Sequence, residues 1–130
     1  MIILTLRTDK PEAEIGLFDD RTQLTHETWQ AHRQLAETIH FKIAAVLEMQ
    51  KKTWADVQGI VAYQGPGSFT GLRIGLSVAN ALASSNDIQI VAKTGEDWIK
   101  DGIATLLEGN GSAVVLPEYG APVHITPQKK

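Results

Sequence analysis

The stretch from residue 59 to residue 83 constrains the fold more than any other part of the chain. An apolar run at residues 59–63 leads into the sequence Gly65-Pro66-Gly67, and a helical pattern follows from residue 72. A strand, a glycine loop and a helix in this order place backbone N–H groups at the start of a helix, where an anion or a phosphate can bind. The stretch therefore predicts an α/β fold with a candidate anion-binding loop.

The helix of this stretch is apolar on nearly every side. Between residues 72 and 83 only Arg73, Ser77 and Asn80 are polar, and they share one narrow stripe at positions i, i+4 and i+7. A helix that is apolar almost all round is buried on more than one side. A sheet covers one side, so we expect something else to cover the other.

Small residues recur at every fourth position of this helix and form a ridge: Gly71, Gly75, Ala79 and Ala83. Three leucines flank the ridge: Leu72, Leu76 and Leu82. A ridge of small residues lets a second helix approach closely, and that contact would offset the roughly 1 kcal/mol that glycine costs against alanine inside a helix. We predict a partner interface, with a core helix crossing its neighbour within the domain as the alternative. Replacing Gly75 by leucine should then abolish association and leave the fold soluble.

Composition narrows the class of protein. The chain has 130 residues, 43% of them hydrophobic and 21% charged, which is typical of one globular domain. Its formal net charge of −3 argues against a domain that binds nucleic acid by its own electrostatics. It has no cysteine, which excludes disulfides and thiolate chemistry. We expect a soluble cytoplasmic protein, because no apolar run approaches the ~18 residues of a membrane span and the N-terminus lacks a signal-peptide pattern.

The first half of the chain predicts an antiparallel meander and a long helix. Strands are expected at residues 2–6, 14–18 and 22–29, joined by short links. Residues 31–52 show a helical core face, which is made by Leu35, Ile39, Ile43 and Leu47. A second apolar strip, made by Phe41, Ala45 and Met49, is displaced from the first. That strip is either a wide core face or a second contact with the partner, beside the glycine helix.

The second half predicts two β–α units. Strands at residues 58–63 and 88–92 are each followed by a helix, the later one at about residues 95–107 with Thr94 as its cap. The sum is a mixed five-stranded sheet with helices on both faces, in a single lobe at residues 1–112. Residues 113–130 contain Pro117, Pro122 and Pro127 and predict an extended segment that packs on the same domain, with a strand expected at residues 113–116.

Catalytic motifs are not matched. No lysine follows Gly71 as a P-loop requires, and Thr70 stands where the dinucleotide fingerprint needs its third glycine. The residues around Ser68 do not form a nucleophile elbow. The four histidines lack metal-ligand spacing, so we predict no metal site and no catalytic residue.

Residues 65–75, which read Gly-Pro-Gly-Ser-Phe-Thr-Gly-Leu-Arg-Ile-Gly, resemble the signature of the bacterial TsaB family, also called YeaZ. The resemblance covers roughly residues 1–107, and residues 117–122 are similar to the family's closing segment. It implies the fold of the actin-like ATPases, which is ribonuclease H-like. It also implies a short form, because relatives carry a second lobe that would start near residues 108–113.

The resemblance implies a non-catalytic role in a complex that makes threonylcarbamoyladenosine next to the anticodon of tRNA. In this family the partner TsaD transfers the threonylcarbamoyl group, and the ATPase TsaE binds where the two meet. Pairing with a TsaD-like subunit, or with a second copy in isolation, uses the helices at residues 31–52 and 70–83, and tRNA is reached only through the complex. The implied interface residues are Gly71, Leu72, Gly75, Leu76, Ala79, Leu82, Ala83, Phe41 and Ala45.

Two further readings of the glycine loop stay open. Actin-like ATPases carry an aspartate after the first strand, where this chain has Arg7, Thr8 and then Asp9. The resemblance therefore implies no cofactor of the chain's own, with ATP or ADP expected only at an interface shared with partners. The loop residues that would face it are Gly65, Gly67, Ser68 and Thr70. The alternatives are a nucleotide-binding ATPase that uses the loop as a phosphate cradle, and a homodimer with peptidase-like activity.

Overall fold

The computed structural model describes residues 1–31, 34–67 and 69–116. The elements follow in the order β1 (Ile2–Arg7), β2 (Glu12–Asp19), β3 (Thr22–Gln30), α1 (Leu35–Met49), the 3₁₀ turn η2 (Trp54–Asp56), β4 (Val57–Tyr63), α2 (Phe69–Asn86), β5 (Gln89–Lys93) and α3 (Trp98–Leu107). Residues 117–130, which include most of the expected extended segment, lie outside the described residues.

The described strands form one mixed sheet in the order β3-β2-β1-β4-β5. The pairs β1–β2 and β2–β3 are antiparallel, and β1–β4 and β4–β5 are parallel. The predicted meander followed by two parallel β–α units is therefore confirmed. Because β1 continues toward β2 and β4 continues toward β5, the carboxyl ends of β1 and β4 mark the place where the chain direction across the sheet reverses. In open α/β sheets, ligands bind at such a place.

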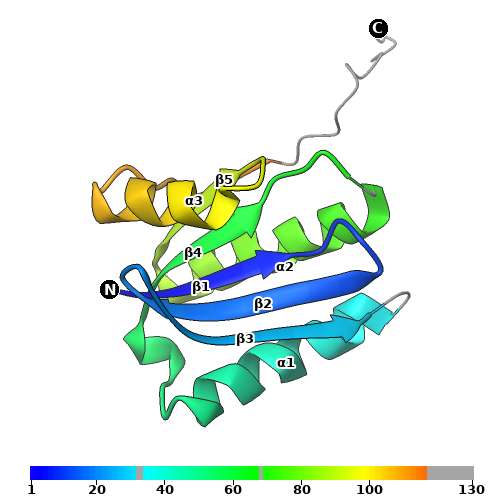
Figure 1. Ribbon diagram of the computed structural model, residues 1–130, viewed down its shortest axis with the longest axis horizontal. Coiled ribbons are helices and arrows are strands. Elements are labelled where there is room, and N and C mark those ends of the chain that lie inside the picture. Colours follow the sequence, from blue (N-terminus) through cyan, green and yellow to red (C-terminus); the bar gives the residue numbers. More distant parts are fainter. Residues whose placement is uncertain (32–33, 68, 117–130) are drawn as a thin grey trace, which may run out of the picture.

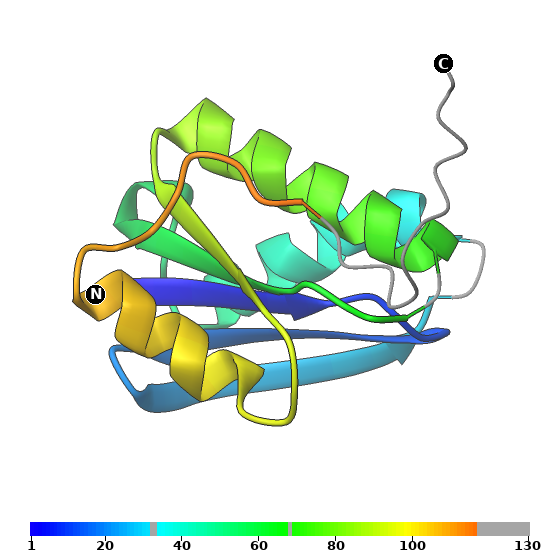
Figure 2. The ribbon, with the colours of Figure 1, turned by 90° about the horizontal axis from the view of Figure 1, so that it is seen from above.

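Helices cover both faces of the sheet, as predicted. Figure 2 shows α1 and α2 together on one face and α3 on the opposite face. The helix α3 packs on β4 and β5, while β1 to β3 are left without a helix on that side (Figure 1). The core lies mainly between the sheet and the α1–α2 layer, where Leu4, Leu6, Ile39 and Ile60 are fully buried.

Several element boundaries differ from the prediction. The first helix ends at Met49 rather than residue 52, because Lys51 adopts a left-handed backbone conformation with φ +55°. The last helix begins at Trp98 rather than residue 95, because Gly95 turns the chain with φ +86° and Asp97 takes the cap position expected of Thr94. Residues 113–116 do not form the expected strand, and pairing with β5 is limited to a bridge between Ile90 and Ser112.

Candidate functional site

The glycine loop lies at the carboxyl ends of β1 and β4. Gly65 has φ +116°, a conformation that a side chain would oppose, so a glycine is required there. Gly67 is required for space, because a Cβ atom at this position would overlap the side chain of Asp9. Thr70 is exposed in the first turn of α2, and Ser68 lies outside the described residues. The loop is thus shaped by contact with Asp9 as well as by its own turn.

Asp9 is the polar centre of this site and is bound by Arg7. The Nε atom of Arg7 donates to Oδ1 of Asp9 at 2.7 Å, and its Nη2 donates to Oδ2 at 3.2 Å. Asp9 is only 8% exposed. The hydrogen bond from Arg7 to Asp9 raises the pKa of the guanidinium above its ordinary value, against the opposing effect of burial. Both carboxylate oxygens of Asp9 are therefore already occupied by a permanent cation.

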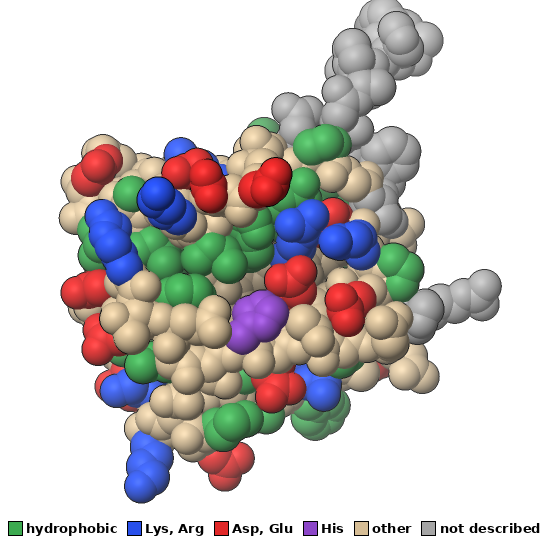
Figure 3. All heavy atoms as spheres, viewed as in Figure 1, with side chains coloured by type: hydrophobic (Ala, Val, Ile, Leu, Met, Phe, Trp, Pro, Cys, Tyr) green, Lys and Arg blue, Asp and Glu red, His purple; other side chains and the backbone are tan. Residues whose placement is uncertain are grey.

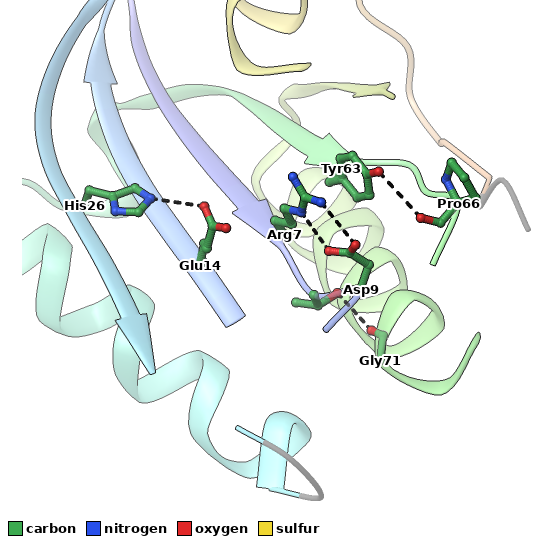
Figure 4. Close-up of polar contacts among 8 residues, drawn as sticks. Arg7, Asp9, Glu14, His26, Tyr63, Pro66 and Gly71 are labelled. Atoms are coloured by element: carbon green, nitrogen blue, oxygen red, sulfur yellow. Dashed lines mark hydrogen bonds and ion pairs between the residues drawn. The ribbon is translucent and has the colours of Figure 1, made fainter. Parts of the chain in front are cut away.

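Two aromatic rings close the cluster on the side of β4. The guanidinium of Arg7 lies 3.9 Å from the centroid of the Tyr63 ring, in a cation–π contact. The Trp98 ring meets Tyr63 edge-on, with centroids 5.8 Å apart. The hydroxyl of Tyr63 donates to the carbonyl of Pro66 at 3.5 Å, which ties the ring to the glycine loop. Figure 4 shows Arg7, Asp9, Tyr63 and Pro66 gathered between the ends of the strands and the start of α2.

This geometry is a satisfied polar cluster more than an open phosphate cradle. A Cβ atom at Gly67 would lie 3.2 Å from Oδ2 of Asp9, so the Asp9 side chain packs directly against the glycine loop. The guanidinium of Arg7 is held in its ion pair with Asp9 and is not offered to an anion. The sequence indicated Arg7 and Asp9 as separate residues. Their ion pair forms where the chain leaves β1, and the sequence did not predict it.

The two glycines of the small-residue ridge pack against a segment of the same chain. The side chain of Thr8, in the link after β1, fills the space above Gly75, where a Cβ atom would overlap Oγ1 and lie 2.8 Å from the Thr8 Cβ and Cγ2 atoms. A Cβ atom at Gly71 would overlap the carbonyl oxygen of Thr8. Thr8 Oγ1 also donates to the carbonyl of Gly71 at 2.8 Å. The close approach predicted from the glycines is real, but a segment of the same chain makes it.

Four other predicted interface residues of this helix are between 0% and 3% exposed: Leu72, Leu76, Ala79 and Ala83. They belong to the hydrophobic core cluster that α2 shares with the sheet. Together with Gly71 and Gly75 they pack within the chain, as the alternative of a core helix within the domain expects. Their role in an interface stays a prediction.

The outer surface of the α1–α2 layer carries apolar side chains of a different kind. Phe41 is 77% exposed and Met49 is 56% exposed, and Ala45 between them is also exposed. We call Phe41, Ala45 and Met49 the outer strip. It is not part of a wide core face, so the first alternative given for it is excluded.

The helix α2 contributes a half-buried row to the same layer. The row consists of Ile74, Val78 and Leu82, which are partly exposed and pack against the core. Of these, only Leu82 was among the predicted interface residues. Ile74 and Val78 were not among the predicted interface residues, although they share the four-residue spacing of the small ridge.

The opposite face of the molecule has a cavity of its own. About 420 Å³ lie between α3 and the β2–β3 hairpin, with Phe18, Ile99 and Ile103 as the apolar part and charged residues of both signs at the rim. Figure 3 shows the hydrophobic side chains gathered beside α3 on this face. His26 and Glu14 form a pair at 3.3 Å on the same side of the sheet.

Two classes of site are not found in the described part of the chain. No group of three or more His, Cys, Asp or Glu residues there could hold a metal ion. No described helix is long and apolar enough to cross a membrane.

Comparison with known proteins finds a family model, a curated relative and solved structures that are similar to this chain. A family model described as "TsaD: tRNA N6-adenosine threonylcarbamoyltransferase" matches residues 29–92. The tRNA threonylcarbamoyladenosine biosynthesis protein TsaB of Escherichia coli K12 is 28% identical over 91 residues, which cover 70% of this chain and 39% of that protein. The chain thus spans about two fifths of the length of the curated relative that it matches.

Solved structures agree with the sheet topology. YeaZ from Pseudomonas aeruginosa matches with a TM-score of 0.68 and 23% identity, over 83% of this chain and 50% of that one. RuvC of Thermus thermophilus in complex with a Holliday junction substrate matches with a TM-score of 0.53 and 13% identity, over 95% and 85%. At these identities the likeness shows the fold alone, which is the ribonuclease H-like fold of the actin-like ATPases.

Proposed function

We propose that the chain, which is similar to TsaB (YeaZ) proteins, is a non-catalytic subunit in the synthesis of threonylcarbamoyladenosine in tRNA. The name of the Escherichia coli relative supports a role in threonylcarbamoyladenosine biosynthesis. The TsaD family model matches residues 29–92, which include α1 and α2. In the described part of the chain, the polar groups at the glycine loop are paired with one another and leave no evident acid, base or nucleophile.

We propose that the binding surface is the outer face of the α1–α2 layer. The observation that carries this proposal is Phe41, a phenylalanine 77% exposed beside a second large apolar residue on the same helix. Aromatic anchors of this kind dominate the binding energy of many interfaces. The half-buried row of α2 extends the apolar surface toward the neighbouring helix. The predicted positions Phe41, Ala45 and Leu82 lie on this surface, while the buried ones pack within the chain.

The partner that fits this proposal is a TsaD-like subunit. Both helices lie on one face of the sheet, so a partner with a similar helix pair can pack four helices together (Figure 2). A TsaE-like ATPase and tRNA would join through that complex, in the cytoplasm. In the absence of the partner, a second copy can use the same face, and we expect weak self-association at high concentration.

The test is a binding measurement on the full chain with a matched control. Phe41→Asp places a charge in the centre of the proposed interface and should weaken binding to a purified TsaD-like subunit by at least about 30-fold, which corresponds to ~2 kcal/mol. Leu107→Asp is the control, because Leu107 is also an exposed apolar residue (38%) but lies on α3, across the sheet. Equal binding by parent and Phe41→Asp would overturn the proposed surface.

We also propose that any ATP or ADP in such a complex is bound mainly by residues of the partners. Asp9 packs against Gly67 and keeps Arg7 in a two-bond ion pair, so neither group is open to Mg²⁺ or to a phosphate, and the purified chain should bind Mg-ATP no tighter than millimolar in calorimetry. Sub-micromolar binding or steady ATP turnover by the chain alone would instead support the phosphate-cradle alternative.

A further inference from the structure

The cavity on the α3 side of the sheet has an apolar floor and a charged rim. It has a volume of about 420 Å³ and lies between α3 and the β2–β3 hairpin. We call it the α3 pocket. Its floor is made by Phe18, Ile99 and Ile103, of which Phe18 is 7% and Ile103 is 2% exposed. A pocket of this size, apolar inside and bordered by a few polar groups, is typical of sites for small molecules.

Arg21 stands on the hairpin side of the rim and is not neutralised by its neighbours. It follows Asp19 and Asp20 directly, but both of these carboxylates contact the Met1 ammonium, at 3.7 Å and 2.7 Å. Within residues 1–31, 34–67 and 69–116 the guanidinium of Arg21 has no ion pair or hydrogen bond. This cation at the edge of an apolar floor is therefore available to a bound molecule.

Charges of both signs border the pocket on the side of α3. Asp97 is the cap residue of α3, but its side chain makes no cap hydrogen bond. Lys100 follows it by three residues, so the two side chains are neighbours on the helix surface. In the described part of the chain, neither of them forms an ion pair, and the same holds for Glu96. The rim thus offers unpaired acids and an unpaired base side by side.

We propose that the α3 pocket binds a free α-amino acid with an apolar side chain, such as leucine. The ligand's carboxylate would lie between Arg21 of the hairpin and Lys100 of α3, in charge-assisted hydrogen bonds. Its ammonium would lie against Asp97 and Glu96. The two charged groups of an α-amino acid are attached to one carbon atom, so they can meet opposite charges that are neighbours on a helix. The side chain would cover the apolar floor.

The surroundings of the pocket favour a small molecule over a protein partner. Side chains two apart on a strand share a face, so Glu14 lies on the same face of β2 as Phe18, and it pairs with His26 at 3.3 Å. The sheet next to the pocket is therefore polar. Figure 3 shows hydrophobic side chains beside α3 bordered by side chains of Lys, Arg, Asp and Glu. Three apolar side chains offer far less than the roughly 800 Å² that each partner buries in a stable protein complex.

The test is a titration of the full chain with L-leucine, followed residue by residue by NMR. The amides of Ile99 and Lys100 should shift in a saturable manner, with a dissociation constant of about 1 mM or tighter, as molecules of this size can reach. The same amides should not move in the presence of glycine at equal concentration, since glycine has no side chain to cover the floor. Absence of saturable shifts at α3, even at tens-of-millimolar leucine, would overturn the proposal.

Two analogues of leucine test whether both charged groups are recognised. 4-Methylpentanoate lacks the ammonium and isoamylamine lacks the carboxylate, and each should bind at least about 5-fold more weakly than leucine, as the loss of exposed ion pairs implies. Equal binding of leucine and either analogue would show that only one charge is recognised and would overturn the assignment of an amino acid.

A matched pair of double variants tests the place of binding. Arg21→Gln with Lys100→Gln removes both proposed carboxylate partners and should weaken leucine binding at least about 5-fold. Lys10→Gln with Lys51→Gln removes two exposed cations outside the pocket and should leave it unchanged. All four positions are exposed, so the core stays intact. Undiminished binding by the first variant, or an equal loss in the second, would overturn the site.

This proposal goes beyond the subunit role proposed above and can fail separately from it. The α3 pocket and the outer strip lie on opposite faces of the sheet (Figure 2). Phe41→Asp should therefore leave leucine binding unchanged, and the loss of the two pocket cations should leave binding of a TsaD-like subunit unchanged. Leucine binding that requires the added subunit would place the site at that interface and would overturn the α3 pocket as its location.

Discussion

The two faces of the α1–α2 layer carry apolar rows that look alike in the sequence and differ in the structure. The inner row, on α2, is made of small residues and leucines and is packed inside the chain by Thr8 and the sheet. The outer strip, on α1, has Phe41 and Met49 more than half exposed. Both rows repeat at every fourth residue, so their spacing alone could not separate them.

This difference shows that glycines in a helix and large apolar side chains on its surface indicate different things. Glycine at Gly71 and Gly75 reports a close approach of backbone, and here the approaching group is Thr8 of the same chain. A large apolar side chain at the surface exposes apolar area to water, which is unfavourable, and a bound partner would cover that area. Evidence for a partner therefore rests on Phe41 and its neighbours, and the glycines report only internal packing.

The largest expected difference between the rows is in stability. Leu76→Ala, at a position 3% exposed, should lower the free energy of unfolding by about 2–5 kcal/mol, because it removes buried methyl groups and leaves a cavity. Phe41→Ala should change it by less than about 0.5 kcal/mol. Urea denaturation of the two variants measures both. A loss above 2 kcal/mol for Phe41→Ala would mean that the outer strip is part of the core after all.

The next effect tests the close approach itself. Gly75→Ala should destabilise the fold by about 1–3 kcal/mol, although alanine is the better helix former, because its Cβ overlaps Thr8. The earlier expectation that a bulky residue here leaves the fold intact is therefore reversed. In a double-mutant cycle by urea denaturation, Thr8→Gly should recover part of the loss. Purely additive effects would show that the two positions do not touch.

A smaller effect is expected from the hydroxyl of Thr8. Thr8→Val removes the hydrogen bond to the Gly71 carbonyl and should cost about 1 kcal/mol. Thr105→Val is the matched control, since Thr105 Oγ1 donates to the Asp101 carbonyl at 3.0 Å in an exposed setting. Thermal unfolding should separate the two variants. Equal losses of stability in the two variants would indicate that burial does not determine how much the Thr8 hydrogen bond contributes.

The smallest effect concerns an ion pair at the surface. Asp20 accepts a hydrogen bond of 2.7 Å from the Met1 ammonium and raises the pKa of that ammonium above its ordinary value of 8.0. Because the pKa of the ammonium is higher in the folded chain than in the unfolded chain, the ion pair contributes its full stabilisation below pH 8. This stabilisation is lost as the pH rises through the pKa of the folded chain. The loss should be slight because both groups are exposed. Asp20→Asn should flatten this part of the melting-temperature profile between pH 7 and 10, and an unchanged profile would contradict the pairing.

Much of the fold was readable from the sequence. The β-branched run of β1, the two short links of the meander and the four-residue repeat of Leu35, Ile39 and Ile43 predicted the elements and their order. The family signature at residues 65–75 predicted the fold type that YeaZ and RuvC share with this chain. Boundaries were less accurate, because the left-handed turn at Lys51 leaves no residue signal that is specific to it.

The candidate site was only partly readable. The sequence named Gly65 and Gly67 but not the ion pair of Asp9 with Arg7 that borders the loop. It did not separate Phe41, which is exposed, and Leu82, which is half-buried, from four leucines and alanines that are buried, and it did not indicate that Ile74 and Val78 are half-exposed. These errors share one cause. A helical wheel gives the direction in which each side chain leaves the helix axis. It does not show which part of the chain, or which other molecule, lies in that direction.

The sequence by itself determined the periodicities, the turns and the requirement that something approach α2 at its glycines, because these follow from backbone geometry over a few residues. Only the tertiary structure decided that Thr8 makes that approach, since Thr8 lies more than sixty residues away and reaches α2 through the pairing of β1 with β4. The same long-range packing left Phe41 outside the core. Local rules fix which side chains must be covered, and the folded chain as a whole fixes which ones it covers itself.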